Sequence, residues 1–131
     1  MKIIVAGDYC DHGRTSALIA DSDFSSLFDE IKPVVENADF SIVNFEFPVV
    51  VNDAEPIEKF GPVLKGQRKA IDAIKYAGFN VCTLANNHIL DQGEKACINT
   101  QTHLNEAFIS TVGIGKDLDN AKRILYLESA G

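Results

Sequence analysis

Short apolar runs alternate with segments of helical periodicity along this chain, and that alternation constrains the fold more than any other feature. The run Lys2-Ile-Ile-Val-Ala6 is β-branched and apolar on both faces, as in a strand that is buried inside a parallel sheet. Similar runs predict further strands over residues 39–44, 80–84, 109–112 and 124–127, and helical spacing predicts helices over 24–31, 67–77 and 92–107. This order predicts an α/β fold: a parallel βαβ sheet with right-handed crossovers and helices layered on both of its faces.

Composition narrows the class of protein. The 131 residues are 46% hydrophobic and 24% charged, which fits one globular domain with a real core. The net charge of −7 argues against nucleic acid as a partner, because phosphate backbones need a basic surface. No apolar run approaches the roughly 20 residues that span a bilayer, and Met1–Ala6 is too short for a signal peptide. We therefore expect a cytoplasmic protein without a membrane segment; the sequence leaves the oligomeric state open.

Two features concern the organisation of the chain. The three cysteines show no CxxC spacing, which is typical of free thiols in a reducing compartment. The predicted strand 124–127 begins close to residue 131, so we expect residues 1–131 to be a single α/β domain that forms the N-terminal part of a larger one. The segment Glu46–Lys65 holds three of the four prolines, and a structureless loop of about 20 residues is usually functional in a compact domain.

Polar residues suited to binding a metal ion follow three of the predicted strands. Asp8 follows the first strand, Glu46 the second, and Asn87 and His88 the third. Because parallel strands share one carboxyl edge, these side chains should converge there. Carboxylate and amide oxygens suit Mg²⁺ or Mn²⁺, with Fe²⁺ or Zn²⁺ as alternatives because of the imidazole. Each position also has a purely structural explanation: aspartates cap loops, charged residues end strands, and asparagines form left-handed turns.

Other polar residues are weaker candidates. Arg14 lies in the loop after Asp8 and could pair with a phosphate, and Lys65 precedes a helix N-terminus, where anions are favoured. Asn86, next to Asn87, is a further candidate for contact with a substrate or anion. Asp91, with Glu94 three residues on, is expected to cap the third helix.

At these residues the chain resembles the bacterial poly-γ-glutamate capsule biosynthesis family, whose fold is similar to that of the calcineurin-like metallophosphoesterases. The most specific block is Ala85-Asn-Asn-His-Ile-Leu-Asp-Gln-Gly93, and the others are Gly7-Asp8 with Arg14, Val43-Asn-Phe-Glu-Phe-Pro48 and Val112-Gly-Ile-Gly-Lys-Asp-Leu118 with Ala121. The resemblance implies that Asp8, Glu46 and Asn87 are metal ligands and that His88 is the catalytic imidazole beside a reacting phosphate. It also implies a metallophosphatase-like α/β sandwich, of which this chain is a part.

Three hypotheses about function follow. The first is a metal-dependent phosphoester hydrolase of the capsule biosynthesis family, acting on a small molecule or a polymer precursor. The second is a non-hydrolytic accessory protein in capsule polymer biosynthesis. The third is a non-catalytic α/β binding module that retains the motifs as structural turns. The sequence departs from the resemblance in lacking an export signal, in ending before the family's further histidine motifs, and in having Phe45 where the family's motif reads Asn-Leu-Glu.

Overall fold

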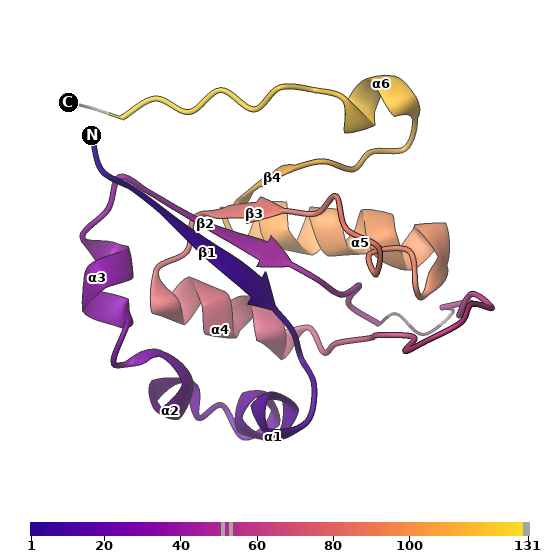
Figure 1. Ribbon diagram of the computed structural model, residues 1–131, viewed down its shortest axis with the longest axis horizontal. Helices are drawn as coiled ribbons and strands as arrows, with labels where there is room; N and C mark the ends of the chain where they lie inside the picture. The colour runs from indigo at the N-terminus through magenta and orange to yellow at the C-terminus, as the bar shows by residue number, and fades with distance from the viewer. Residues whose placement is uncertain (51, 53, 130–131) are drawn as a thin grey trace.

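The computed structural model describes residues 1–50, 52 and 54–129, and it confirms the α/β class (Figure 1). The strands are β1 Ile3–Tyr9, β2 Phe40–Phe45, β3 Val81–Thr83 and β4 Ser110–Val112. The helices are α1 Arg14–Ala20, α2 Phe24–Phe28, α3 Lys32–Glu36, α4 Lys69–Ala77, α5 Gly93–Glu106 and α6 Leu118–Ala121. No helix in this described part of the chain is both long and apolar enough to cross a membrane.

The described strands form one four-stranded sheet in the order β1-β2-β3-β4, with every neighbouring pair parallel. All carboxyl ends therefore lie at the same edge, as the sequence predicts. The register between β1 and β2 slips after Val5, so that Asp8, rather than Gly7, stands opposite Asn44. Such a bulge re-aims a side chain, and here it sets Asp8 beside its partner on β2.

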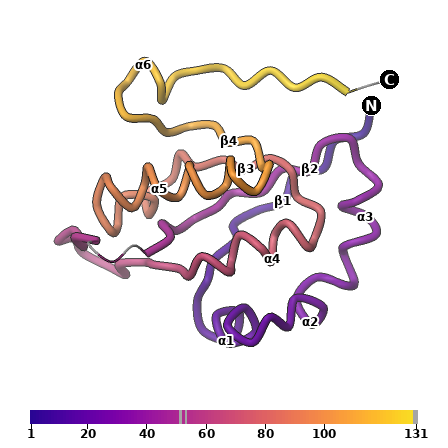
Figure 2. The backbone as a smooth tube through the Cα atoms, turned by 180° about the vertical axis from the view of Figure 1, so that it is seen from behind, coloured from indigo at the N-terminus to yellow at the C-terminus, as the bar shows by residue number. Residues whose placement is uncertain are grey.

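The prediction of helices on both faces is wrong. In β2, Ser41, Val43 and Phe45 are buried on one face, and this face meets helices: the Ser41 hydroxyl donates to the Val35 carbonyl of α3 at 2.8 Å. In β1, the Tyr9 hydroxyl donates to the Ala70 carbonyl of α4 at 3.1 Å. The view from behind in Figure 2 has α4 and α5 together in front of the strands. When strands follow one another in sequential order, right-handed crossovers place each connecting helix on the same side; both faces are covered only if the strand order reverses.

A single hydrophobic core lies between the helices and this inner face of the sheet. Its largest fully buried side chains include Phe45 and Phe47, whose ring centroids are 4.3 Å apart. Cys82 and Cys97 are buried here as free thiols, as predicted, and burial raises the pKa of Cys82 to about 12. The cysteines therefore act as small apolar residues.

The outer face of the sheet is only partly covered. Ile3 and Val5 of β1 are 51% and 73% exposed. The segment after α6 runs past this side, and the Ser129 hydroxyl donates to the Asp39 carboxylate at 2.7 Å (Figure 1). The predicted strand 124–127 is wrong, since these residues pair with no strand among those described. Burial does alternate along this segment, with Leu125 and Leu127 half-buried and Ile124 and Tyr126 exposed. Such alternation does not specify which strand, if any, the segment pairs with.

The helical predictions hold best where a turn residue ends the helix. Gly78 ends α4 in a left-handed conformation with φ of 95°, as predicted from its position. The predicted helix 24–31 is instead the shorter α2, and α3 begins beside Pro33, which starts a fresh turn. Helix α1 was not predicted, because its seven residues are too few to show a helical period and no side chain caps its start.

Candidate functional site

Asp8 is held at the sheet edge by its neighbour on β2. The Asn44 side-chain amide donates to the Asp8 carboxylate at 2.8 Å, while the Asn44 carbonyl oxygen accepts from the Thr83 hydroxyl at 3.2 Å. Both residues lie inside their strands rather than after them. This network across three strands fixes where the Asp8 carboxylate points.

Glu46, one residue past β2, lies against Asp8. Burial raises the pKa of Glu46, and so do the negative charge of Asp8 and a hydrogen bond with it, whereas the nearby His88 acts in the opposite direction. Residues from the ends of β1, β2 and β3 are thus brought together, as the sequence predicts for Asp8, Glu46 and His88. Two carboxylates this close repel each other unless a proton or a cation lies between them.

Asn86 builds the turn that carries His88. Its amide nitrogen donates to Asn44 Oδ1 at 3.2 Å and to the Phe45 carbonyl at 3.0 Å, and its Oδ1 accepts from the backbone amides of His88 and Ile89. These bonds use both donors and both lone pairs of the side chain. In this structure Asn86 contacts the turn and β2, not an open surface. Asn87, by contrast, has an exposed side chain.

His88 is oriented by the buried carboxylate of Asp91. His88 Nδ1 lies 2.7 Å from Asp91 Oδ2, and the side chains are 12% and 0% exposed. Asp91 Oδ1 lies 2.5 Å from Lys59 Nζ, and Oδ2 also accepts from the Leu64 amide at 2.6 Å. Burial alone would raise the pKa of Asp91, but hydrogen bonds from Lys59, His88 and Leu64 lower it below the usual value. The carboxylate is therefore ionised at neutral pH. Since an ionised carboxylate can only accept, the Nδ1–H group of His88 donates a hydrogen bond to it.

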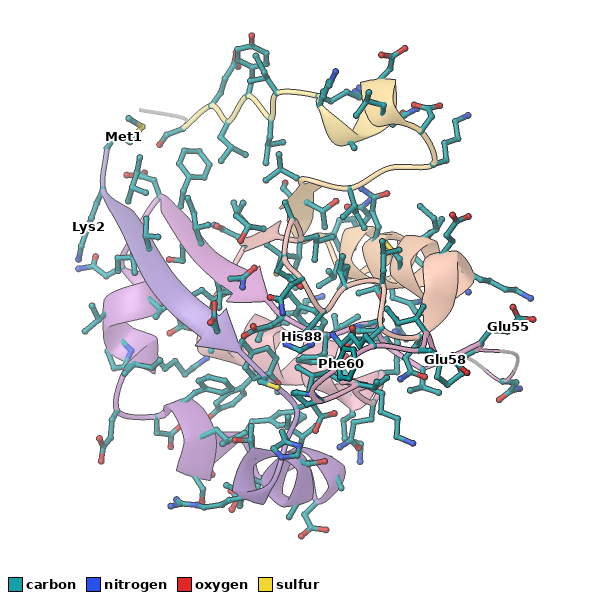
Figure 3. All side chains as sticks on the ribbon, turned by 45° about the vertical axis from the view of Figure 1, so that its right-hand side comes forward. Met1, Lys2, Glu55, Glu58, Phe60 and His88 are labelled. Atoms are coloured by element: carbon teal, nitrogen blue, oxygen red, sulfur yellow. The ribbon has the colours of Figure 1, made fainter. Side chains whose placement is uncertain are left out.

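The predicted capping role of Asp91 is wrong. Helix α5 begins at Gly93 after Gln92, and no side chain caps it. Asp91 instead fastens the 54–65 loop: its backbone carbonyl accepts from the Ile57 amide at 3.1 Å, and Gln92 Nε2 donates to the Leu64 carbonyl at 3.0 Å. The loop residue Lys59 lies 3.1 Å from His88 through its Nζ and the ring Nδ1, and Figure 3 shows the neighbouring Phe60, Glu58 and Glu55 of the same loop. The loop predicted to be functional thus borders the site.

Two weaker candidates stand apart from this network. Arg14 is the first residue of α1 and Lys65 precedes Gly66; both are exposed. A cavity of about 490 Å³ lies between α5, β4 and the segment after it, but its lining includes none of Asp8, Glu46 and His88. The candidate site therefore lies outside this cavity, at the sheet edge.

Comparison with known proteins shows the family of the chain. Residues 2–131 match the family described as bacterial capsule synthesis protein PGA_cap. The chain belongs to this capsule synthesis family. The match spans every residue discussed above, from Asp8 to Asp91, and it agrees with the resemblance seen in the sequence.

Curated relatives carry related names. The chain is 34% identical over 102 residues to the capsule biosynthesis protein CapA of Bacillus anthracis, covering 76% of this chain and 25% of that protein. It is 26% identical over 98 residues to the PGA biosynthesis protein CapA of Bacillus subtilis, with 75% and 26% covered. It is 33% identical over 96 residues to a probable polyglutamine synthesis accessory protein of Mycobacterium tuberculosis, with 72% and 25% covered. The chain thus spans about a quarter of the length of these relatives.

The metal ligands expected for this capsule family member are present only in part. Asp8 and Glu46 provide the carboxylates that hard divalent cations prefer, and Asn87 has an exposed amide. However, the residues that the structure describes include no group of three or more His, Cys, Asp or Glu side chains close enough to hold a metal ion. Since Mg²⁺ takes about six ligands, these carboxylates fit a metal by donor type but do not complete its coordination.

One residue of the site was missed from the sequence. Lys59 lies 29 positions from His88 in a loop without periodicity, yet its Nζ is 3.1 Å from His88 Nδ1. No spacing rule connects a loop lysine to a histidine at that separation. The one available signal was the prediction that the 46–65 loop is functional.

Proposed function

We propose that this chain contributes a metal-dependent phosphoester hydrolase site to capsule polymer synthesis. The supporting observation is the contact between the Asp8 and Glu46 carboxylates beside His88, whose other side is held by Asp91. Two acids in contact, with an imidazole near enough to influence one of them, at the carboxyl edge of a parallel sheet favour chemistry over a purely structural role. The relatives' names support the polymer-synthesis context.

Asp8 and Glu46 would bind the cation, with Asn87 as an additional oxygen ligand. The raised pKa of Glu46 records the cost of holding two negative charges together. A divalent cation, Mn²⁺ or Mg²⁺ first and Fe²⁺ or Zn²⁺ as alternatives, would remove that repulsion. When bound, such an ion lowers the pKa of a coordinated water and withdraws charge from a phosphoryl oxygen.

His88 would act on the phosphate through Nε2. Because Nδ1 donates to ionised Asp91, Nε2 is the nitrogen left to face a ligand. A protonated Nε2 donates to a phosphoryl oxygen or to the leaving group, and a neutral one accepts a proton from water. The turn built by Asn86 holds His88 near enough to Glu46 for the ring to act on the pKa of that carboxyl group.

A second candidate is a non-hydrolytic accessory protein that binds a partner or polymer during synthesis. Two observations favour it: one relative is named as an accessory protein, and the described residues supply an incomplete ligand group. In that case Asp8 and Glu46 would still bind a cation, but no phosphoester would be cleaved. The third candidate, a binding module without metal, predicts that the protein neither binds a cation at Asp8 and Glu46 nor cleaves a phosphoester.

A metal titration with paired variants separates these functions. Purified protein is titrated with Mn²⁺ by electron paramagnetic resonance, and hydrolysis of p-nitrophenyl phosphate is measured in the same samples. We expect Asp8→Asn and Glu46→Gln each to weaken Mn²⁺ binding about tenfold or more. We expect His88→Ala to keep Mn²⁺ binding but to lose about 10²-fold or more in hydrolysis rate.

The exposed Asp119→Asn serves as the matched control and should change neither quantity. Mn²⁺ binding that depends on Asp8 without any hydrolysis would support the accessory function. If Mn²⁺ binds equally to wild type and to Asp8→Asn, the metal site, and the hydrolase with it, is wrong.

A further inference from the structure

The loop residue Lys59 supplies the cation that offsets a buried acid beside His88. Asp91 is 0% exposed and ionised, and Lys59 Nζ lies 2.5 Å from its Oδ1. The other groups that donate to this carboxylate are the Leu64 amide and the His88 ring. An ionised carboxylate out of contact with water is costly unless it is paired with a cation, and Lys59 is the amine that pairs with it here.

Lys59 is directed inward rather than toward a ligand. Its ammonium group has three N–H donors, and its near neighbours are Asp91 Oδ1, the Asn87 carbonyl at 3.4 Å and His88 Nδ1 at 3.1 Å. The side chain is 20% exposed. Because these neighbours already engage the ammonium group, we expect Lys59 to influence the site through them.

The contacts at Nδ1 admit two arrangements of the His88 ring. While Nδ1 carries a proton it donates to Asp91 Oδ2, and Lys59 cannot donate to it. If Asp91 lost its charge or moved, Nδ1 could accept a proton from a donor, and the neutral ring would then carry its proton on Nε2. The nitrogen presented to the sheet edge would change from an acceptor to a donor.

We propose that Lys59 is a positioning residue which, by pairing with the Asp91 carboxylate and holding it in place, fixes the Nδ1-protonated form of His88 and holds the 54–65 loop against the site. The inference deepens the proposed function, since it concerns the residue that would act on the phosphate. It adds Lys59, a loop residue, to the side chains proposed to take part in the function. The same carboxylate that orients His88 also binds the Leu64 amide, so ring and loop respond to Lys59 together.

The loop geometry supports this coupling. Ile57 and Leu64, on either side of Lys59, donate through their backbone amides to Asp91. The loop also passes close to the start of α5, where a side chain at Gly93 would lie 3.0 Å from the Glu55 carbonyl. Lys59 thus sits in the middle of a segment fastened at both sides to the turn that carries His88.

The test measures the ring directly, without metal or substrate. Protein labelled with ¹⁵N histidine is examined by two-bond ¹H–¹⁵N correlation at one fixed pH where the histidines are neutral. His12 and His103 remain as internal references, and His88→Gln assigns the signals. Hydrogen exchange at the Ile57 and Leu64 amides reports on the loop in the same variants.

Lys59→Met removes the charge and keeps most of the side-chain length. We expect it to reduce the Nδ1-protonated share of His88 by about half and to speed exchange of the Leu64 amide by about tenfold. Lys59→Arg should restore at least part of both signals, since it keeps the charge. Glu58→Gln, an exposed change in the neighbouring loop position, should leave both signals as in wild type.

Unchanged His88 signals in Lys59→Met would overturn the proposal, even if the loop exchanged faster, because the lysine would then only fasten the loop. Should Lys59→Met not fold, the comparison of Lys59→Gln with Lys59→Arg replaces it under the same criteria. Because the ring is read in the absence of any reaction, a protein that binds no Mn²⁺ and hydrolyses nothing can still confirm or refute the role of Lys59.

Discussion

Two groups of acids in this site are built in opposite ways. At the sheet edge, Asp8 and Glu46 lie against each other, and among the residues that the structure describes neither pairs with a lysine or arginine; their repulsion contributes to the raised pKa of Glu46. In the turn after β3, Asp91 is buried, surrounded by a lysine, an imidazole and a backbone amide, and its pKa is lowered. The Asp8–Glu46 pair therefore carries negative charge that a bound cation would offset, whereas the charge of Asp91 is already offset by Lys59.

This difference indicates that Asp8 and Glu46 form the part of the site that binds a ligand, whereas Asp91 and its partners form the part that supports it. Uncompensated carboxylates at the end of parallel strands lower stability until a cation arrives, and such cost is typical of binding sites. The compensated cluster around Asp91 instead stabilises the fold and sets the orientation of His88. Mutations at the two groups should therefore have opposite consequences.

The largest effect is expected at Asp91. Asp91→Ala removes the acceptor of three donors, the Lys59 ammonium, the His88 ring and the Leu64 amide, so we expect the free energy of unfolding to fall by about 3–5 kcal/mol. Urea denaturation followed by circular dichroism measures the loss. Asp21→Ala, an exposed aspartate after α1, should change stability by no more than about 0.5 kcal/mol. Similar values for the two variants would mean that the cluster has no special contribution.

A smaller loss is expected where neutral hydrogen bonds support the turn. Asn86→Ala removes two hydrogen bonds that join the turn to β2 and two that lie within the turn, and we expect about 1–3 kcal/mol of destabilisation. Its neighbour Asn87 has an exposed side chain, so Asn87→Ala should stay within about 0.5 kcal/mol in the same denaturation experiment. Equal effects at the two asparagines would contradict the structural role of Asn86.

The smallest expected effect concerns how stability changes with pH, because Glu46 and Asp91 should contribute with opposite signs. The pKa of Glu46 is raised on folding, so the folded state binds its proton more tightly, and stability falls as pH rises from about 4.3 through the raised value. The pKa of Asp91 is lowered, so its contribution is present above about 3.9 and is lost as pH falls through the lowered value.

Stability curves between pH 3 and pH 7 test both signs. Glu46→Gln should flatten the decline on the neutral side and raise stability slightly at pH 7, by less than about 1 kcal/mol. Asp91→Asn should flatten the decline on the acid side and lower stability at pH 7. A Glu46→Gln protein that is less stable than wild type at pH 7 would show that the two acids are not opposed in the way described.

The predictable part of this protein is the part governed by local pattern. The β-branched run before Asp8 gives β1, the helical spacing before Gly78 gives α4, and the polar residues after three strands give the sheet-edge cluster. These succeed because side-chain period and turn chemistry act over a few residues. Helix α1 was missed because a helix of seven residues without a side-chain cap shows neither signal.

The predictions from the sequence that were wrong concern how the elements and side chains are arranged in space. Helices on both faces were expected from the βαβ order, but the order alone does not say in which direction the strands are added. The segment 124–127 has a strand-like pattern yet passes the outer face without pairing among the described residues. Asp91 was read as a helix cap because its partners Lys59 and Leu64 are 32 and 27 residues away.

The sequence by itself determined that this chain is a parallel α/β protein and that Asp8, Glu46 and His88 would meet at one sheet edge. That much follows from periodicity, since parallel strands must end together. Only the tertiary structure decided that the helices share one face, that Asp91 is a buried anion rather than a cap, and that Lys59 neutralises it. Burial and charge pairing depend on contacts between residues far apart in the chain, and no local pattern encodes them.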